Sequence, residues 1–179
     1  MILFEFQFDP GVVAEDRTTN IAVANSSALQ ETYFVMPVRL TIGHVELLEI
    51  PPKYDQRLQR NIKGNYIPGQ KGNTLVTMPW LELPLINLAS VGLDAVIAVG
   101  QQGSSFYTLP DFGWRLVFTL FEKDVEVHSQ VNGNTARVKY DSLVCAFRKF
   151  TLEVKATLKR EVPELQEHVV WGRWLQEIE

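Results

Sequence analysis

The sequence predicts an α+β fold, with an antiparallel sheet arranged as a meander and two main helices packed on one face. Residues 112–140 contain three runs in which apolar and polar residues alternate, as in strands with one buried face. Residues 141–161 then carry apolar residues at spacings of three and four, which is typical of an amphipathic helix. Residues 79–99 show a second, more apolar helical pattern. Because 179 residues is a usual length for one domain, we expect a single domain over residues 1–179, with five to seven strands.

The three strands in residues 112–140 are expected to form two hairpins. Asn132-Gly133 is the pair that best accepts the positive φ angles of a two-residue type I′ turn. With these two residues as the loop, Val127 lies opposite Val138, so that apolar side chains meet on one face. A second two-residue turn at Glu122-Lys123 places Phe118 opposite Val127 on the same face. The two turns agree on which face is apolar, and this agreement predicts an antiparallel meander.

The helix in residues 141–161 has start and stop signals. Asp141 or Ser142 is the expected N-cap, because its side-chain oxygen can accept from a first-turn N–H. Pro163 disfavours helical geometry at Val162 and so ends the helix. Five apolar residues form a stripe along one side, namely Leu143, Phe147, Phe150, Val154 and Leu158. We expect this stripe to pack on the apolar face of the meander.

The N-terminal third predicts further strands. Ile2–Phe8 and Tyr33–Ile42 both alternate, and Val45–Ile50 follows a turn and ends at two prolines. Pro37 cannot donate to a ladder, so the strand that contains it is expected at an edge or at a bulge. Residues 12–32 are rich in Thr, Asn and Ser and are expected to form a loop.

Three other segments complete the chain. Residues 53–74 are polar and basic, and they are expected to form either an ordinary exposed loop or a partner-binding loop. Residues 101–111 are expected to form a connecting loop. Residues 163–178 are expected to form a short final helix with its tryptophans on one side.

Composition excludes several classes of function. The hydrophobic fraction is 46%, the charged fraction is 21% and the net charge is −4, which gives no support for general binding to nucleic acid or to an anionic membrane. Cys145 is the only cysteine, so an intramolecular disulfide is excluded and a reducing compartment is favoured. The first residues lack the pattern of a signal peptide, and we expect a cytoplasmic protein. Cys145 itself is expected to be a small buried residue of the helix rather than a nucleophile.

Motifs for catalysis, metals or cofactors are weak. The segment Gly64–Lys71 has the glycines of a phosphate-binding loop, but its lysine falls one place late and Pro68 removes a backbone donor. The three histidines, His44, His128 and His168, are far apart in the sequence and have no cysteine cluster beside them. We therefore predict no metal, no cofactor and no enzymatic activity.

One group of polar residues falls on the outer face of the predicted meander. Its members are Arg115, Glu126, His128, Arg137 and Lys139. A histidine between a carboxylate and cations can act as a general base or bind an anion. Charged pairs across a hairpin are also how an ordinary solvated face is built, and the predicted register sets Glu126 against Lys139. The solvated face is the interpretation that we favour.

The C-terminal part of the sequence resembles small bacterial immunity proteins of polymorphic toxin systems. The resemblance extends over residues 112–175 and lies in Ala136–Tyr140, in Asp141–Phe147 followed by Phe150 and Val154, in Pro163-Glu-Leu, and in Trp171 with Trp174. These positions are mostly expected core residues, and the family has no catalytic signature to transfer. The resemblance implies a cytoplasmic protein that binds and neutralises one cognate toxin.

Two acidic segments are the candidates for a partner-binding surface. Residues 1–52 hold seven acidic residues against two arginines, and residues 161–179 hold five glutamates against one arginine. Because immunity-type proteins often meet cationic toxins, we expect partner contacts at Asp16, Glu46, Glu49, Glu164 and Glu167.

The leading hypothesis is therefore a non-enzymatic protein-binding module of the immunity type. The alternative is a small-molecule-binding protein or enzyme with a pocket between sheet and helices. A structural subunit of a homo-oligomer is a third possibility. The sequence names neither the partner nor the oligomeric state.

Overall fold

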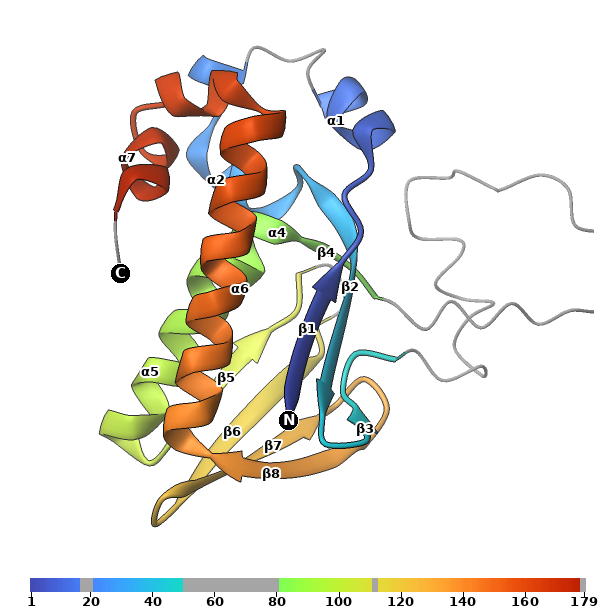
Figure 1. Ribbon diagram of the computed structural model, residues 1–179, viewed down its shortest axis with the longest axis vertical. Coiled ribbons are helices and arrows are strands. Elements are labelled where there is room, and N and C mark those ends of the chain that lie inside the picture. The colour runs from blue at the N-terminus through green and yellow to red at the C-terminus, as the bar shows by residue number, and fades with distance from the viewer. Residues whose placement is uncertain (17–20, 50–80, 111–112, 178–179) are drawn as a thin grey trace, which may run out of the picture.

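The computed structural model describes residues 1–16, 21–49, 81–110 and 113–177. It confirms the α+β class with antiparallel pairing, but the strands form two four-stranded sheets instead of one. We call the sheet of β1 to β4 sheet A and the sheet of β5 to β8 sheet B. Figure 1 shows the long helix α6 running past both sheets. The loop expected at residues 53–74 and the glycine segment Gly64–Lys71 lie outside the described residues.

Sheet A comes from the first half of the chain. Its strands are β1 (Ile2–Phe6), β2 (Val35–Ile42), β3 (Val45–Glu46) and β4 (Leu81–Pro84). All pairs are antiparallel, with β1 on one side of β2 and with β3 and β4 on the other. Every second residue of β2 is buried, from Met36 to Ile42, as the alternation predicts.

The expected edge position of the Pro37 strand is wrong, because β2 is the centre of sheet A. The carbonyl of Pro37 accepts from the N–H of Gln7, which follows β1. The carbonyl and the nitrogen of one residue point to the same side of an antiparallel strand, so the ring nitrogen of Pro37 also faces the side of β1. The last paired residue of β1 is Phe6, opposite Val38. Pro37 therefore lies where the β1–β2 ladder ends, and the missing donor removes no bond within the ladder.

Sheet B is the predicted meander with one strand added. Its strands are β5 (Ser104–Thr108), β6 (Arg115–Phe121), β7 (Asp124–Ser129) and β8 (Thr135–Lys139), paired in that order. The two-residue turn at Glu122-Lys123 is confirmed, with Phe118 opposite Val127 and Glu122 at φ 58°. Strand β5 replaces part of the loop expected at residues 101–111.

The predicted two-residue turn at Asn132-Gly133 is wrong, because the pairing of β7 with β8 is shifted by two residues from the predicted register. Val127 lies opposite Ala136 instead of Val138, and the N–H of Ser129 donates to Asn134. Residues 130–133 therefore form a four-residue loop. Its shape follows from contacts outside the hairpin, because the side chain of Asn132 donates to the backbone oxygens of Glu46 and Glu49. A shift of two residues preserves the buried and exposed faces.

Helix α6 (Tyr140–Glu161) joins the two sheets. It begins at Tyr140, one residue before the expected caps, and Lys139 is the N-cap residue. Asp141 lies in the first turn, where the helix dipole favours a negative charge. All five predicted stripe residues are buried. The ring of Phe147 contacts Phe4 of sheet A at 4.7 Å and Phe118 of sheet B at 6.2 Å between centroids. The stripe is thus shared between two sheets, where one was expected.

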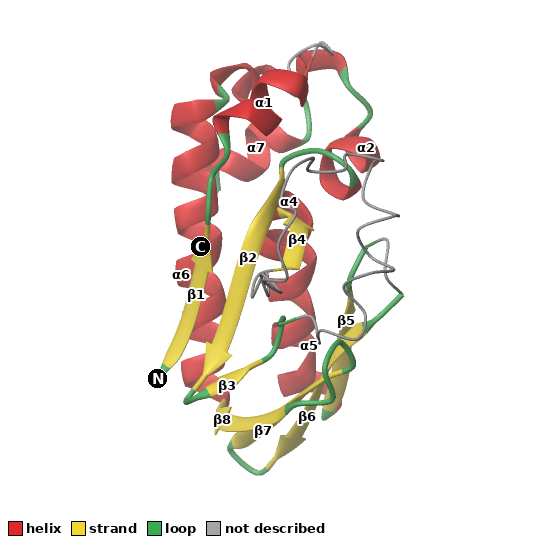
Figure 2. Cartoon of the chain, turned by 90° about the vertical axis from the view of Figure 1, so that its right-hand side faces the viewer, coloured by secondary structure: helices red, strands yellow, loops and turns green. Residues whose placement is uncertain are grey.

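The second helical stretch runs from Leu85 to Gln102. It consists of α4 (Leu85–Asn87), a π-helical segment (Leu88–Gly92) and α5 (Leu93–Gln102). The expected start at residue 79 is wrong, since Leu81–Pro84 pairs with β2 as a strand. The expected stop at Gly100 is also wrong, because the helix ends at Gly103, which has φ 77°. Figure 2 shows α5 and α6 together behind the sheets.

This helical stretch is long and apolar enough to cross a membrane by length and composition alone. In the structure, 56% of Leu85–Gln102 is buried inside the protein. Gly92 packs against Phe147, whose ring would lie 3.1 Å from an added Cβ. The apolar character of the stretch is therefore explained by its position in the core beside α6.

The remaining described helices are short. They are α1 (Pro10–Asp16), a 3₁₀ turn (Ile21–Val23), α2 (Ser26–Glu31), a 3₁₀ helix (Pro163–Glu167) and α7 (Trp171–Gln176). The loop expected at residues 12–32 is thus largely helical where it is described. Asn25 caps α2, accepting from the N–H of Ser27 at 2.9 Å. Polar residues that favour loops also favour helix caps, which is why composition alone misled the prediction.

Candidate functional site

The outer face of sheet B gathers the most distinctive exposed side chains. In every strand of this sheet, alternate residues point away from the helices, and the pairing aligns them across the four strands. We call this surface the open face. Its main members are Phe106, Arg115, Val117, Thr119, Phe121, Glu126, His128, Arg137 and Lys139. All five members of the predicted polar group therefore lie on one surface.

Two phenylalanines of the open face are exposed. Phe106 on β5 is 52% exposed and Phe121 at the end of β6 is 45% exposed. The guanidinium carbon of Arg115 lies 4.3 Å from the ring centre of Phe106. That of Arg137 lies 4.7 Å from the ring centre of Phe121. Each ring is therefore paired with a cation that stacks on it, an arrangement that contributes about 0.5–1 kcal/mol at an exposed site.

The polar members of the open face pair in another register than expected. Glu126 lies opposite Arg137 instead of Lys139, and Lys139 forms an ion pair with Asp124 at 2.6 Å. Nδ1 of His128 lies 3.0 Å from the hydroxyl of Thr135. These side chains are exposed or partly exposed to solvent. The arrangement suits surface recognition better than general-base catalysis.

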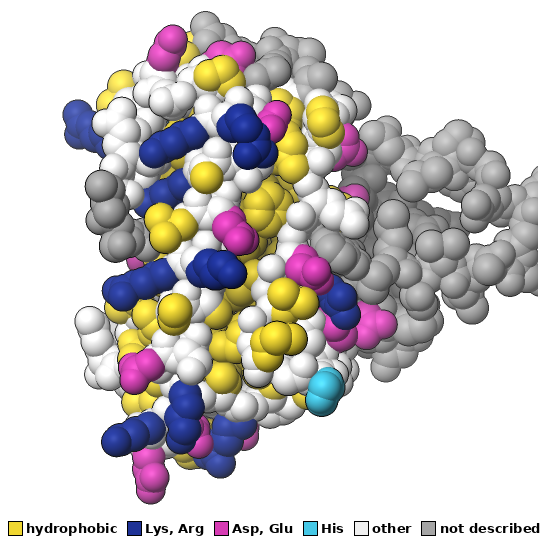
Figure 3. Space-filling model, viewed as in Figure 1, with side chains coloured by type: hydrophobic (Ala, Val, Ile, Leu, Met, Phe, Trp, Pro, Cys, Tyr) yellow, Lys and Arg dark blue, Asp and Glu magenta, His cyan; other side chains and the backbone are white. Residues whose placement is uncertain are grey.

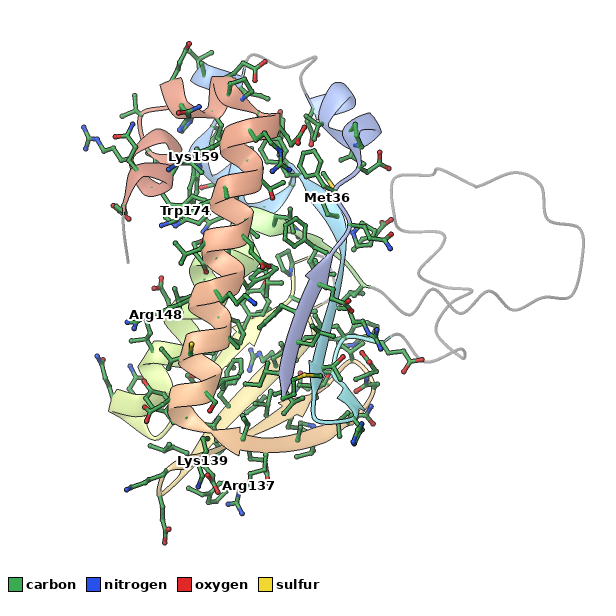
Figure 4. All side chains as sticks on the ribbon, viewed as in Figure 1. Met36, Arg137, Lys139, Arg148, Lys159 and Trp174 are labelled. Carbon is green, nitrogen blue, oxygen red and sulfur yellow. The ribbon has the colours of Figure 1, made fainter. Side chains whose placement is uncertain are left out.

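Figure 4 shows where two of these side chains lie. Arg137 and Lys139 project at the lower end of the molecule, away from the helices that cover the other side of sheet B. In the space-filling view of Figure 3, several Lys and Arg side chains lie at the same lower end, with Asp and Glu side chains among them. On the open face, the two cations of β8 lie beside the carboxylates of Asp124 and Glu126 on β7.

A shallow groove lies at the border of the open face, between α5 and β5. Its volume is about 480 Å³, and the residues that line it include Val91, Ala95 and Ala98 of the helical stretch, together with Ser104 and Phe106 of β5. The alternative hypothesis expected a pocket between sheet and helices. This groove lies between helix α5 and sheet B, at the flank of the sheet.

The predicted acidic residues do not form one surface. Asp16 is 8% exposed, and its carboxylate accepts from the N–H of Phe34 at 2.8 Å. Glu46 and Glu49 are partly buried beside β3, whereas Glu164 and Glu167 are exposed on the 3₁₀ helix after α6. Figure 1 places β3 and this 3₁₀ helix at opposite ends of the molecule.

Glu46 belongs to an ion-pair network on the outer face of sheet A. Its Oε1 accepts from Nε of Arg39 at 2.9 Å and from the hydroxyl of Thr41 at 2.8 Å. Nη1 of Arg39 also donates to Glu5 at 3.3 Å. Partial burial acts to raise the pKa of Glu46, but the hydrogen bonds from Arg39 and Thr41 outweigh it, and the pKa is lowered. Glu46 is thus engaged within the protein.

Sequence reasoning missed the exposed aromatic residues. Phe106 falls in the segment 101–111 that is expected to be a loop, and Phe121 lies on the outer face of the first expected strand without being singled out as a site residue. The signal for β5 was present in Ser104–Thr108, where hydroxyl and aromatic residues of high strand propensity follow one another. Cys145 was also misplaced, since it is exposed on the side of α6 opposite to the stripe.

The described residues contain no group of three or more His, Cys, Asp or Glu that could hold a metal ion. Comparisons with protein-family models, with curated proteins and with solved structures give no match for this chain.

Proposed function

We propose that this chain is a non-enzymatic protein-binding domain, similar in role to the immunity proteins that neutralise a cognate toxin. The observation that carries the proposal is the open face, where Phe106 and Phe121 are exposed beside Arg115 and Arg137. Aromatic residues and arginine are the types most enriched at the energetic centres of protein interfaces. Single exposed apolar residues are ordinary, but two rings on one sheet face, each covered by an arginine, suit a contact surface.

The charges of the open face suggest the chemistry of the partner. A guanidinium stacked on a ring keeps its in-plane N–H donors available for carboxylates. Neither Arg115 nor Arg137 forms an ion pair with a carboxylate among the described residues. The partner surface that fits is therefore apolar at its centre and carries carboxylates around it. The cationic partner expected from the acidic segments has less support, because those segments lie apart.

A small-molecule-binding role is the second candidate, and the groove beside β5 favours it. Its volume of about 480 Å³ falls within the usual range of ligand sites. The two candidates predict different ligands and different contact residues, so they can be separated directly.

The test is affinity capture with the full chain as bait, in extracts of the organism that encodes it. We expect one specific protein to be retained, and its retention to be lost with Phe121→Ser. Leu152→Ser is the matched control, because Leu152 on α6 is 46% exposed and Phe121 is 45% exposed. A thermal-shift screen of metabolites runs in parallel. A metabolite that raises the melting temperature, without any retained protein, would contradict the proposal.

A second experiment tests neutralisation. The gene for the retained partner is expressed in a bacterial host with and without this chain. We expect growth arrest by the partner alone and restored growth when the chain is present. Phe121→Ser should fail to restore growth, while Leu152→Ser should restore it.

A further inference from the structure

Within the described part of the chain, strand β5 leaves one row of its backbone groups unpaired. The carbonyl of Gly103 accepts from Leu120, and the N–H of Leu109 donates to Trp114, so odd-numbered residues of β5 face β6. In an antiparallel strand the intervening residues point their N–H and C=O groups to the other side. The backbone groups of Ser104, Phe106 and Thr108 therefore face the free edge. They have no hydrogen-bond partner among the described residues.

The other edge of sheet B is protected in a way that β5 is not. The outward-facing backbone groups of β8 belong to Thr135, Arg137 and Lys139, and two of these side chains are cationic. Charged side chains are a common device that discourages further strand pairing. Residues 104–108 of β5 carry no charge at all. The two edges are thus chemically different, and only β5 is suited to accept a strand.

A groove runs beside this free edge. Ala95 and Ala98 of α5 form one wall and β5 the other, in the space of about 480 Å³ described above. Ala95 and Ala98 are small and leave room for a chain that lies along the edge, while Asp94 and Gln102 line the same groove. Figure 2 shows α5 next to β5 at one border of sheet B. An edge strand flanked by a helix is a recurring geometry for binding extended peptides.

We propose that β5 and α5 form a docking site for an extended segment of a partner protein, which adds to sheet B as a fifth strand. The proposal rests on the proposed function, since it assumes a protein partner. Backbone groups of the segment pair with Ser104, Phe106 and Thr108. Its side chains alternate, so that small or β-branched apolar residues enter the groove against Ala95 and Ala98. The intervening residues emerge beside Phe106, where the adjacent Arg115 favours a carboxylate.

A partner segment fits this site better than a second copy of the chain. Two copies that paired their β5 strands would each bring an α5 helix to the junction. Both helices would then lie on the same side of the joined sheet and compete for the groove. A single extended segment meets no such obstacle.

The test uses linear peptides selected from a random phage-displayed library on the immobilised full chain. We expect selected peptides in which apolar and acidic residues alternate. Thr108→Pro removes an outward N–H without touching the β6 ladder, and should weaken peptide binding about tenfold or more. Thr108→Ala keeps the N–H and is the matched control, with an affinity within about twofold of the wild type.

Amide hydrogen exchange of the wild-type chain gives an independent readout that requires no variant. Bound peptide should slow exchange at the amides of Phe106 and Thr108. The amide of Tyr107, already paired with β6, should change little. Failure to select any peptide, equal binding to Thr108→Pro, or unchanged exchange at Phe106 would each overturn the proposal.

Two further outcomes separate this proposal from the function it rests on. A captured host protein that binds wild type and Thr108→Pro equally would leave the proposed function intact and refute strand addition. Light scattering that shows a dimer dissociated by Thr108→Pro would identify a second copy as the occupant, and would also refute it.

Discussion

Arginines on the outer faces of the two sheets have different partners. On sheet A, the guanidinium of Arg39 lies between the carboxylates of Glu5 and Glu46. On sheet B, the guanidinium groups of Arg115 and Arg137 lie over phenylalanine rings. The outer face of sheet A therefore satisfies its own charges. The open face of sheet B leaves cationic donors and apolar area exposed.

The two kinds of pairing have different consequences for stability. A charge paired within the protein contributes to folding and is less available for binding. A cation stacked on an exposed ring contributes little to folding, because both groups stay solvated in the monomer. We expect substitutions on sheet A and in the shared core to change stability, and substitutions on the open face to change binding.

The largest effect is expected in the core that both sheets share. Phe147→Ala should destabilise the protein by about 3–5 kcal/mol, because the ring packs against Phe4 and Phe118 at once. Urea unfolding measures the change, with Leu152→Ala as an exposed control on the same helix. A loss below about 1 kcal/mol at Phe147 would mean that the two sheets do not depend on one core.

A smaller effect is expected where the sheets are joined by a hydrogen bond. The hydroxyl of Ser129, which is fully buried on β7, donates to the backbone oxygen of Leu47 just after β3. Ser129→Ala leaves that carbonyl without its donor and should cost about 1–3 kcal/mol. Ser142→Ala, at an exposed position in the first turn of α6, is the control. Equal unfolding midpoints for the two variants would argue against this junction.

On sheet A, Glu46→Gln should destabilise the protein by about 1 kcal/mol at neutral pH, since the network is partly exposed. The pKa of Glu46 is lowered in the folded protein, so the ionised form stabilises the fold above the ordinary carboxyl pKa of 4.5. This contribution is lost as the pH falls below 4.5 through the folded value. The wild type should therefore lose its advantage over Glu46→Gln in acid. Urea titrations at several pH values check this, and a constant difference would contradict it.

The smallest effect on stability is expected on the open face. Arg137→Ala should change the free energy of unfolding by about 0.5 kcal/mol, the lower end of the range for an exposed cation stacked on a ring. The same variant should slow association with a carboxylate-bearing partner, most clearly at low salt. Stopped-flow association at two salt concentrations measures it. If Arg137→Ala destabilised the protein as much as Glu46→Gln, the contrast between the two faces would fail.

Much of the arrangement of sheet B and α6 could be predicted from the sequence. Alternation along β6, β7 and β8 depends only on neighbouring residues, so it fixed which side chains are buried and which form the open face. The stripe on α6 is likewise a local pattern, and all its members are buried. The predicted polar group therefore lies together, although its pairings differ from those expected.

Only the tertiary structure decided the register, the number of sheets and the position of the groove. The loop at residues 130–133 is shaped by the bonds from Asn132 to Glu46 and Glu49, more than eighty residues away in the chain. Leu81–Pro84 becomes a strand because β2 offers it a partner. Phe106 lines the groove because β5 lies at an edge beside α5. Periodicity is set by adjacent residues, whereas pairing and edges depend on which distant segments meet.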